Sequence, residues 1–298
     1  MRRQLRGIPL VLAGGLILAG ALATNTQAQI PRGQLPTDIP TIRHNAGQSV
    51  VPYFEGWVRN ADGTFDLVFG YFNRNYVQEF AIPAGADNKV EPGEMDQGQP
   101  TYFLPRRQRY AYRVRVPADF GKKEVVWSIT SNGRAEKGYG NLIPPQEITE
   151  RVIMTNGNFD PGHDDPNKPP SIKIAPLSKV SLGTPVTLAA TVTDDGLPKP
   201  RPVALAPRDQ AAAAGGFGAQ VNSSADRGPR GLTVSWLQYS GPAKVTFGHT
   251  GTIPVTDGQA VTTATFVEPG TYKLIASAAD PGRLSTKVEI DVTIPSTR

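Results

Sequence analysis

The sequence contains no cysteine, and it has only three histidines and three methionines among 298 residues. Without cysteine the chain forms no disulfide framework, although an oxidising compartment would allow one. A lipid anchor on an N-terminal cysteine is excluded for the same reason. Stability must therefore come from apolar cores, and a chain of this length is long enough to build two ordinary domains.

Recognisable catalytic motifs are also absent. His44, His163 and His249 fall in a predicted lead-in, a linker and a turn, and none stands at motif spacing from a nucleophile or a carboxylate. Neither G-x-S-x-G nor H-E-x-x-H occurs. The sequence predicts no catalytic residue and a protein that is not an enzyme. A pair of carboxylates of the kind that glycosidases use would not show as a motif in one sequence, so an unrecognised hydrolase is the alternative.

The N-terminus has the order of a secretory signal peptide. Three arginines within the first six residues precede an apolar run over residues 8–23, and a polar stretch follows. The run is shorter than the about 20 apolar residues that span a membrane, so no transmembrane segment is expected once the signal is removed. Cleavage after Ala28 is preferred to cleavage after Ala23, because a polar region usually separates the apolar run from the cut. An uncleaved anchor is the alternative, and the arginine pair leaves both the Sec and the twin-arginine route open.

The charge of the exported chain is close to balanced. The whole sequence carries a formal net charge of +5 at pH 7, and removal of the three signal arginines leaves about +2, which gives no general attraction to nucleic acid. The chain is expected to be periplasmic or secreted. An envelope protein or a polysaccharide is its expected partner.

Turn-forming residues are abundant, with 31 glycines and 28 prolines, and helical periodicity is almost absent after the signal. Many short strands between turns fit this pattern. The sequence therefore predicts an all-β fold of two consecutive β-sandwich domains, the second immunoglobulin-like. The expected segments are a signal peptide at 1–28, a polar lead-in at 29–47, a first β domain at 48–154, a linker at 155–170, and a second domain at 171–296 with a long low-complexity loop at about 197–231.

Alternating apolar residues place the strands of the first domain. Asp62-Gly63 predicts a tight turn between two strands. In the strand expected at 110–116, the aromatic and valine side chains are expected to face the core and the arginines to face solvent. The expected strands are Val51–Val58, Thr64–Phe72, Tyr76–Ile82, Tyr110–Val116 and Val125–Thr130, with Tyr110, Tyr112, Val114 and Val116 inward and Arg113 and Arg115 outward.

The second domain is expected to have seven strands, as immunoglobulin-like sandwiches do. Trp236 is expected to fill the space between its sheets, beside Leu188 and Leu274. The predicted strands are 171–175, 185–192, 232–236, 244–247, 260–266, 271–276 and 286–294.

Three motifs stand in a familiar order in the second half. They are Thr193-Asp194-Asp195-Gly196, Val234-Ser235-Trp236 and Glu268-Pro269-Gly270-Thr271-Tyr272. Over about residues 170–296 the chain resembles the PKD-like and related immunoglobulin-like modules of bacterial surface proteins, which implies a β-sandwich that serves as a spacer or adhesion unit. The first half, through Glu55-Gly56-Trp57 and the segment 69–76, resembles an uncharacterised domain of exported bacterial proteins, and this resemblance implies no activity.

Arginines and aromatic residues concentrate in the first domain. Guanidinium forks and aromatic faces suit carboxylates, polyanions or sugars. The chain is therefore interpreted as an exported, non-enzymatic binding or scaffold protein, with carbohydrate or polyanion binding by the first domain as the alternative function. A purely structural role competes with this: the aromatic residues would be core, and Arg106 and Arg107 would pair with Glu91, Glu94 and Asp96. The candidate ligand-binding residues are Arg74, Tyr76, Arg106, Arg107, Arg109 and Tyr110.

Oxygen-bearing side chains crowd the predicted linker. Calcium takes six to eight oxygen ligands, and an interdomain calcium ion rigidifies many extracellular modules. A solvated acidic loop is the alternative. A second candidate group is Asp194 and Asp195 with Asp280, and no other cofactor is expected. The candidate calcium ligands in the linker are Asn158, Asp160, Asp164 and Asp165.

Overall fold

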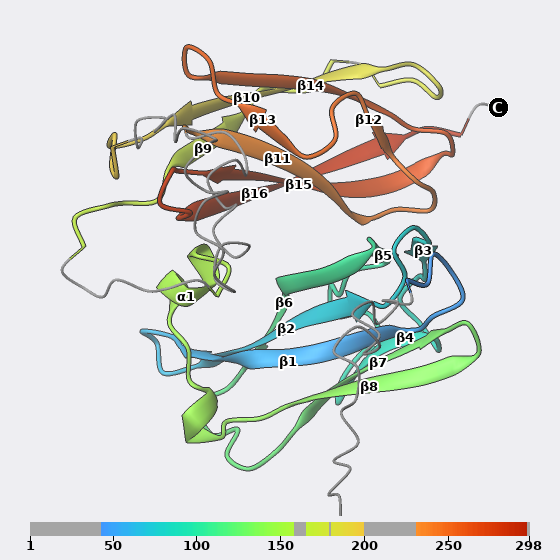
Figure 1. Cartoon of the computed structure of the whole chain (residues 1–298). Coiled ribbons are helices and arrows are strands. Elements are labelled where there is room, and N and C mark those ends of the chain that lie inside the picture. Colours follow the sequence, from blue (N-terminus) through green and yellow to red (C-terminus); the bar gives the residue numbers. More distant parts are fainter. Residues whose placement is uncertain (1–42, 158–164, 179, 200–230, 297–298) are drawn as a thin grey trace, which may run out of the picture. The chain divides into compact units, whose positions relative to one another are not determined.

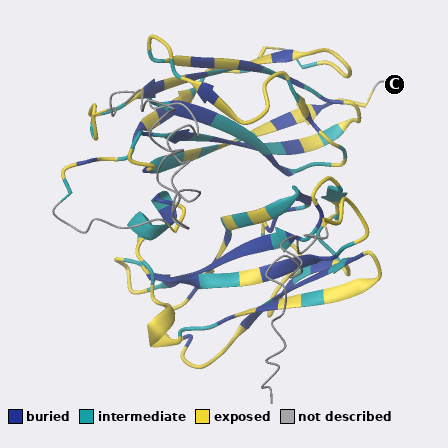
Figure 2. Ribbon diagram, in the orientation of Figure 1, coloured by how far each residue is buried: buried dark blue, intermediate teal, exposed yellow. Residues whose placement is uncertain are grey.

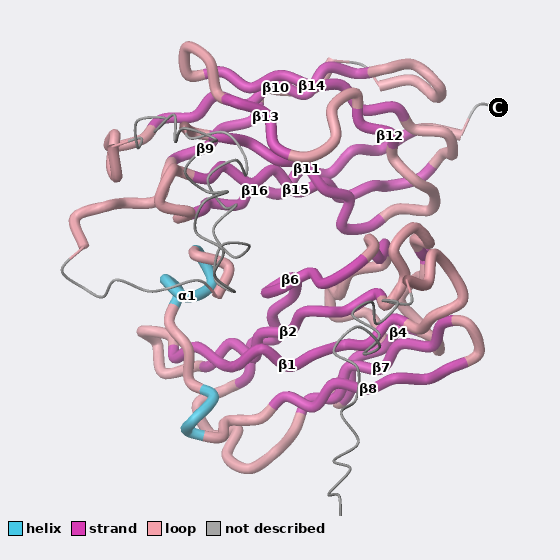
Figure 3. Tube along the Cα trace, viewed as in Figure 1, coloured by secondary structure: helices cyan, strands magenta, loops and turns pink. Residues whose placement is uncertain are grey.

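The structure, a computed structural model, describes residues 43–157, 165–178, 180–199 and 231–296 (Figure 1). Strands dominate these residues, and the helical segments among them are the short η1 (Pro144–Gln146) and α1 (Glu150–Met154) (Figure 3). No helix in the described part of the chain is long and apolar enough to cross a membrane. The predicted all-β fold is confirmed.

The first half of the described chain is built from antiparallel sheets. The predicted Asp62-Gly63 hairpin is confirmed, since the backbone N–H of Asn60 donates to the Thr64 carbonyl at 2.9 Å. The predicted strand over Tyr76–Ile82 is wrong for most of its length, because the amides of residues 76–78 donate to the carbonyls of residues 44 and 45 instead of to a neighbouring strand. The sheets are β1 (Val50–Arg59), β2 (Phe65–Asn73) and β6 (Arg106–Val116) in the order β1-β2-β6; β4 (Asn88–Glu91), β7 (Val125–Ser131) and β8 (Arg134–Gly140) in the order β4-β7-β8; and the pair β3 (Phe80–Ala81) and β5 (Tyr102–Phe103).

An aromatic core is formed by inward residues of both three-stranded sheets. Phe69 and Trp127 are fully buried, and their rings pack edge to face with centroids 6.1 Å apart. The Trp127 indole N–H donates to the Asn88 side-chain oxygen at 2.9 Å, so the buried polar atom is satisfied. Figure 2 shows that β2 is buried along most of its length. Both faces of β2 are covered, because Val68 on the outer face packs against Ile153 of α1.

The second half forms two four-stranded antiparallel sheets. One holds β9, β10 and β14 and the other holds β11, β15 and β16, which is the division of strands between the sheets of an immunoglobulin fold. The predicted immunoglobulin-like sandwich is thus confirmed, with one strand, β13, that the sequence did not predict. The sheets are β9 (Ser171–Ile174), β10 (Val186–Thr193), β12 (Thr246–Phe247) and β14 (Gln259–Thr265) in the order β12-β14-β10-β9, and β11 (Thr233–Ser240), β13 (Thr252–Pro254), β15 (Gly270–Ala279) and β16 (Ser285–Ile294) in the order β13-β11-β15-β16.

Hydrogen bonds connect a loop and helix α1 of the first half to the strands of the second, within the compact unit Arg43–Arg298. The Tyr239 hydroxyl donates to the Gly98 carbonyl at 2.6 Å, and the Ser285 hydroxyl donates to the Met154 carbonyl at 2.7 Å. The predicted limits at 48–154, 155–170 and 171–296 stay predictions. Most of the predicted loop at 197–231 lies outside the described residues.

Trp236 packs between the two hydrophobic clusters of the second sandwich, as the sequence predicts. It contacts the cluster that contains Leu188 and Leu274 and also the cluster that contains Val234. Its indole N–H is buried and has no hydrogen-bond partner among the described residues. The ring therefore contributes through packing rather than through its polar atom.

Replacement of Trp236 tests this arrangement. We expect Trp236→Ala to lower the free energy of unfolding by about 3–5 kcal/mol, because it leaves a cavity between the sheets. Trp236→Phe should cost much less, since the lost N–H makes no hydrogen bond and an aromatic ring still fills the space. Urea unfolding measures both. Equal stability of the alanine variant and the wild type would contradict the placement of the ring.

Candidate functional site

Two β-bulges meet around Gly70 in the centre of β2. The register of β1 shifts between Phe54 and Gly56, and the register of β6 shifts opposite the same part of β2. A Cβ atom on Gly70 would lie 2.5 Å from the Gln108 carbonyl oxygen and 2.6 Å from a carboxylate oxygen of Glu55. Only a residue without a side chain lets both neighbours approach this closely.

The β6 bulge changes the face to which Tyr110 belongs. Tyr112 pairs with Phe69 and Gln108 pairs with Tyr71, so β6 has two more residues than β2 in this interval. Tyr110 has a φ of 49° and packs against Val68 and Ile153 on the outer face of the sheet, instead of joining Tyr112 in the core. The prediction that Tyr110 faces inward is wrong, because strict alternation does not survive a bulge.

Glu55 and Arg107 form an ion pair at the bulges. The Arg107 guanidinium donates to both Glu55 carboxylate oxygens, at 3.0 and 2.9 Å, and lies 5.0 Å from the centroid of the Tyr53 ring. The Glu55 side chain is only 8% exposed, so this bidentate contact satisfies a nearly buried carboxylate. The expected pairing of Arg107 with Glu91, Glu94 or Asp96 is wrong.

Three of the predicted ligand-binding residues form an arginine–aromatic cluster: Arg74, Tyr76 and Arg106. The Arg106 guanidinium lies 4.0 Å from the Tyr76 ring centroid and 4.6 Å from that of Phe72, and it donates to the Arg74 carbonyl at 3.1 Å. Arg74 pairs with Glu136 at 3.4 Å. Arg106 therefore stacks on rings and does not pair with the acidic residues that the sequence suggested.

The other three predicted residues, Arg107, Arg109 and Tyr110, line a cavity of about 820 Å³. One wall is formed by β6, and the other by the outer face of β11, β15 and β16. Its size falls in the range of about 300–1,000 Å³ typical of small-molecule sites. Among the described residues, the charged side chains that line it are basic except for Glu289: Arg107, Arg109, Arg113, Lys273, Arg283 and Lys287.

The basic residues of the second half are not among the predicted site residues. Lys273 and Lys287 occupy ordinary outward positions of two strands, and nothing in the sequence links them to arginines more than 150 positions earlier. Only packing of the two halves brings them to the same cavity. The concentration of arginines in β6 was the one signal that sequence analysis could use.

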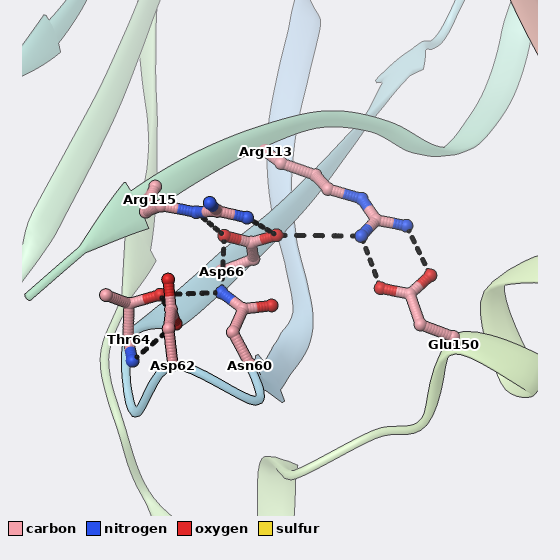
Figure 4. Close-up of polar contacts among 7 residues, drawn as sticks. All are labelled: Asn60, Asp62, Thr64, Asp66, Arg113, Arg115 and Glu150. Atoms are coloured by element: carbon pink, nitrogen blue, oxygen red, sulfur yellow. Dashed lines mark hydrogen bonds and ion pairs between the residues drawn. The ribbon is translucent and has the colours of Figure 1, made fainter. Parts of the chain in front are cut away.

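Figure 4 shows the polar network that fixes Arg113 at the edge of the cavity. Its guanidinium binds both oxygens of Glu150, at 2.5 and 2.8 Å, and lies 3.7 Å from Asp66. Arg115 and Asn60 donate to Asp66 at 2.9 and 3.0 Å. Burial raises the pKa of Asp66, but the hydrogen bonds from Arg115 and Asn60 outweigh it, so the pKa lies below its ordinary value. The charge of Arg113 is therefore balanced by protein carboxylates.

Two cations of the lining have no carboxylate partner among the described residues, Arg109 and Lys287. Arg109 donates to the Asn156 carbonyl at 3.3 Å, and Lys287 donates to the Tyr110 carbonyl at 3.4 Å. Desolvation lowers the pKa of Lys287, the nearby positive charge of Arg113 lowers it further, and the negative charge of Glu289 opposes both effects without outweighing them. Lys273, in contrast, forms an ion pair with Glu289 at 3.0 Å. The cavity thus holds positive charge that the described residues do not neutralise.

Most of the predicted calcium ligands in the linker, Asn158, Asp160 and Asp164, lie outside the described residues. The remaining one, Asp165, accepts hydrogen bonds from the Arg151 guanidinium and from the backbone N–H of Asn167. No cluster of three acidic, histidine or cysteine side chains suited to a metal occurs in the described ranges. Calcium binding stays a prediction.

The second group of candidate calcium ligands comes together only in part. Asp280 accepts a hydrogen bond from the Asn167 side chain at 2.8 Å. Burial raises the pKa of Asp280, and the negative charge of Asp194 raises it further, against the effect of the Asn167 hydrogen bond. Asp195 accepts from the Lys168 amide at 2.9 Å.

Comparison with known proteins gives no family. No family model matches the chain, and no curated protein is similar to it. Among solved structures, a conjugative transposon lipoprotein from Bacteroides eggerthii is 14% identical, with 41% of this chain and 95% of that chain covered and a TM-score of 0.26. The PKD domain of an M14-like peptidase from a Thermoplasmatales archaeon is 15% identical (45% and 100% covered, TM-score 0.22), and the D00-D0 domain of intimin is 13% identical (83% and 100% covered, TM-score 0.26). Scores this low support no inference about the function of this chain.

Substitution of Gly70 tests whether the double bulge shapes the site. We expect Gly70→Ala to lower the free energy of unfolding by about 1–3 kcal/mol, because the new methyl group collides with the Gln108 backbone and with Glu55. Gly231→Ala is the matched control, since nothing lies within 4 Å of its added Cβ atom. Chemical unfolding compares the two variants. A Gly70→Ala variant as stable as Gly231→Ala would show that the close approach is absent.

Proposed function

We propose that this chain is an exported, non-enzymatic binding protein that holds an anionic ligand in the cavity between β6 and the β11-β15-β16 sheet. Export is inferred from the signal-like N-terminus, and the non-enzymatic role from the lack of any catalytic motif in the sequence. An acidic carbohydrate is the ligand class that best joins the cavity to the expected envelope setting.

One observation carries the proposal, the charge of the cavity lining. Six basic residues and one acidic residue line it, and two of the basic side chains, Arg109 and Lys287, reach only backbone carbonyls among the described residues. Positive charge gathered between two protein walls attracts anions more strongly than the same charge spread over a solvated surface. An anionic ligand would relieve the repulsion among these cations.

The arginine–aromatic cluster supports binding less well than the cavity does. Arg106 is stacked against two rings and Arg74 is paired with Glu136, so the polar groups of both are already engaged. A ligand there would have to displace these contacts. We therefore place the proposed ligand in the cavity, and ligand binding by the cluster remains a separate prediction from the sequence.

The test is calorimetric titration of the purified chain with trigalacturonate and with its neutral counterpart galactotriose. We expect binding of the acidic trisaccharide only, with an affinity that falls as salt screens the charges. Arg109→Gln should weaken binding about tenfold or more, because it removes a charged hydrogen-bond donor from the lining.

Arg134→Gln is the matched control, since Arg134 is an exposed arginine at the start of β8 that does not line the cavity. It should bind as the wild type does. Equal binding of the acidic and neutral sugars, or equal loss in the two arginine variants, would overturn the proposal.

A further inference from the structure

The strand register aligns three polar side chains across the cavity wall. Ser235 of β11 lies opposite Ser277 of β15, and Ser277 lies opposite Lys287 of β16. All three residues line the cavity. Because side chains opposite each other on adjacent strands are about 5 Å apart, they form one continuous hydroxyl–ammonium row across three strands.

The donors of this row are free to bind a ligand. Neither serine hydroxyl has a hydrogen-bond partner within the described part of the chain, and the Lys287 ammonium reaches only the Tyr110 carbonyl, at 3.4 Å. An ammonium has three N–H donors, so at least two stay available. The row therefore offers donors and no carboxylate.

The row sits between the contacts that join the two halves. Tyr239 of β11 lies near Lys273 of β15 and donates a hydrogen bond to the Gly98 carbonyl. At the other end of β15, Ala279 pairs with Ser285 of β16, which donates a hydrogen bond to the Met154 carbonyl. These two levels of β15 are about 20 Å apart at about 3.4 Å per residue. Ser277 lies within this interval, and at its level Lys287 reaches across the cavity to the Tyr110 carbonyl of β6.

The next row along the strands has a different character. Leu237 pairs with Ile275, and Ile275 pairs with Glu289, which is held by Lys273 at 3.0 Å. This row offers apolar contact and a carboxylate whose charge is already balanced. An anionic group is therefore directed to the hydroxyl–ammonium row.

We propose that the hydroxyl–ammonium row of Ser235, Ser277 and Lys287 is the subsite that binds a carboxylate group of the ligand. This inference rests on the proposed function and assigns the anion to a place within the cavity. Two hydroxyls and one ammonium can satisfy both oxygens of a carboxylate, and the single charge of Lys287 balances its single charge. A doubly charged phosphate group fits less well, because Arg113, the cation whose charge acts on Lys287, is already paired with Glu150 and Asp66.

Binding of trigalacturonate to two variants tests the subsite. The double variant Ser235→Ala/Ser277→Ala should bind the probe about tenfold more weakly, because it loses two hydrogen bonds without any change in charge. Lys287→Met should lose about tenfold or more and should also show a weaker salt dependence. Lys137→Met, on the exposed edge of β8, is the matched control and should bind as the wild type does.

Competition by inorganic phosphate tests the ligand class. Phosphate should displace the probe at least tenfold less effectively than galacturonate does, and the reverse order would refute the carboxylate assignment. Unchanged thermal unfolding of each variant confirms that it is folded.

The outcomes separate this inference from the proposed function. If the serine and lysine variants bind the probe as the wild type does while Arg109→Gln does not, the anion lies elsewhere in the cavity and the subsite is wrong. If the wild type shows no preference for the acidic trisaccharide, the proposed function fails as well.

Discussion

The missing side chain of Gly70 is the constraint on which the site depends. It leaves room for the Glu55 carboxylate at the β1 bulge and for the Gln108 carbonyl at the β6 bulge, which occupy the space that a Cβ atom on residue 70 would take. Glu55 then fixes Arg107, and the extra residues of β6 turn Tyr110 to the outer face. The carbonyl of Tyr110 in turn contacts Lys287 of the second sandwich. One small residue in a buried strand thus determines which side chains of β6 reach the cavity.

The two halves of the chain contribute different things to this cavity. β6 supplies arginines, of which Arg107 and Arg113 are balanced by carboxylates, while Arg109 has no carboxylate partner within the described ranges. The sheet of the second sandwich supplies regularly spaced rows, because its strands pair without interruption at the level of Ser277. The irregular wall carries much of the charge and the regular wall sets the spacing of the donors. A ligand that contacts both walls would also strengthen the association of the two sandwiches.

Sequence patterns predicted the parts of the fold that follow a strict period of two. The inward placement of Tyr112, Val114 and Val116 in β6 and the position of Trp236 are examples, since one buried face requires one register. The orientation of Tyr110 could not be predicted, because a bulge leaves no mark in the alternation of apolar residues. The cavity could be predicted only in its first wall: the arginines of β6 are close in sequence, whereas Ser277 and Lys287 join them through tertiary packing alone. The short α1 was missed because five residues give too little helical periodicity to recognise.

The most direct test of the account is where an acidic ligand perturbs the chain. Backbone amide NMR of the isotopically labelled protein, titrated with trigalacturonate, reports every affected residue in one experiment. The account predicts shifts that saturate together in both walls of the cavity, at Arg109 to Arg113 in β6 and at Ser277 and Lys287 in β15 and β16. Shifts confined to the cluster of Arg74, Tyr76 and Arg106, with the second sandwich unaffected, would contradict it.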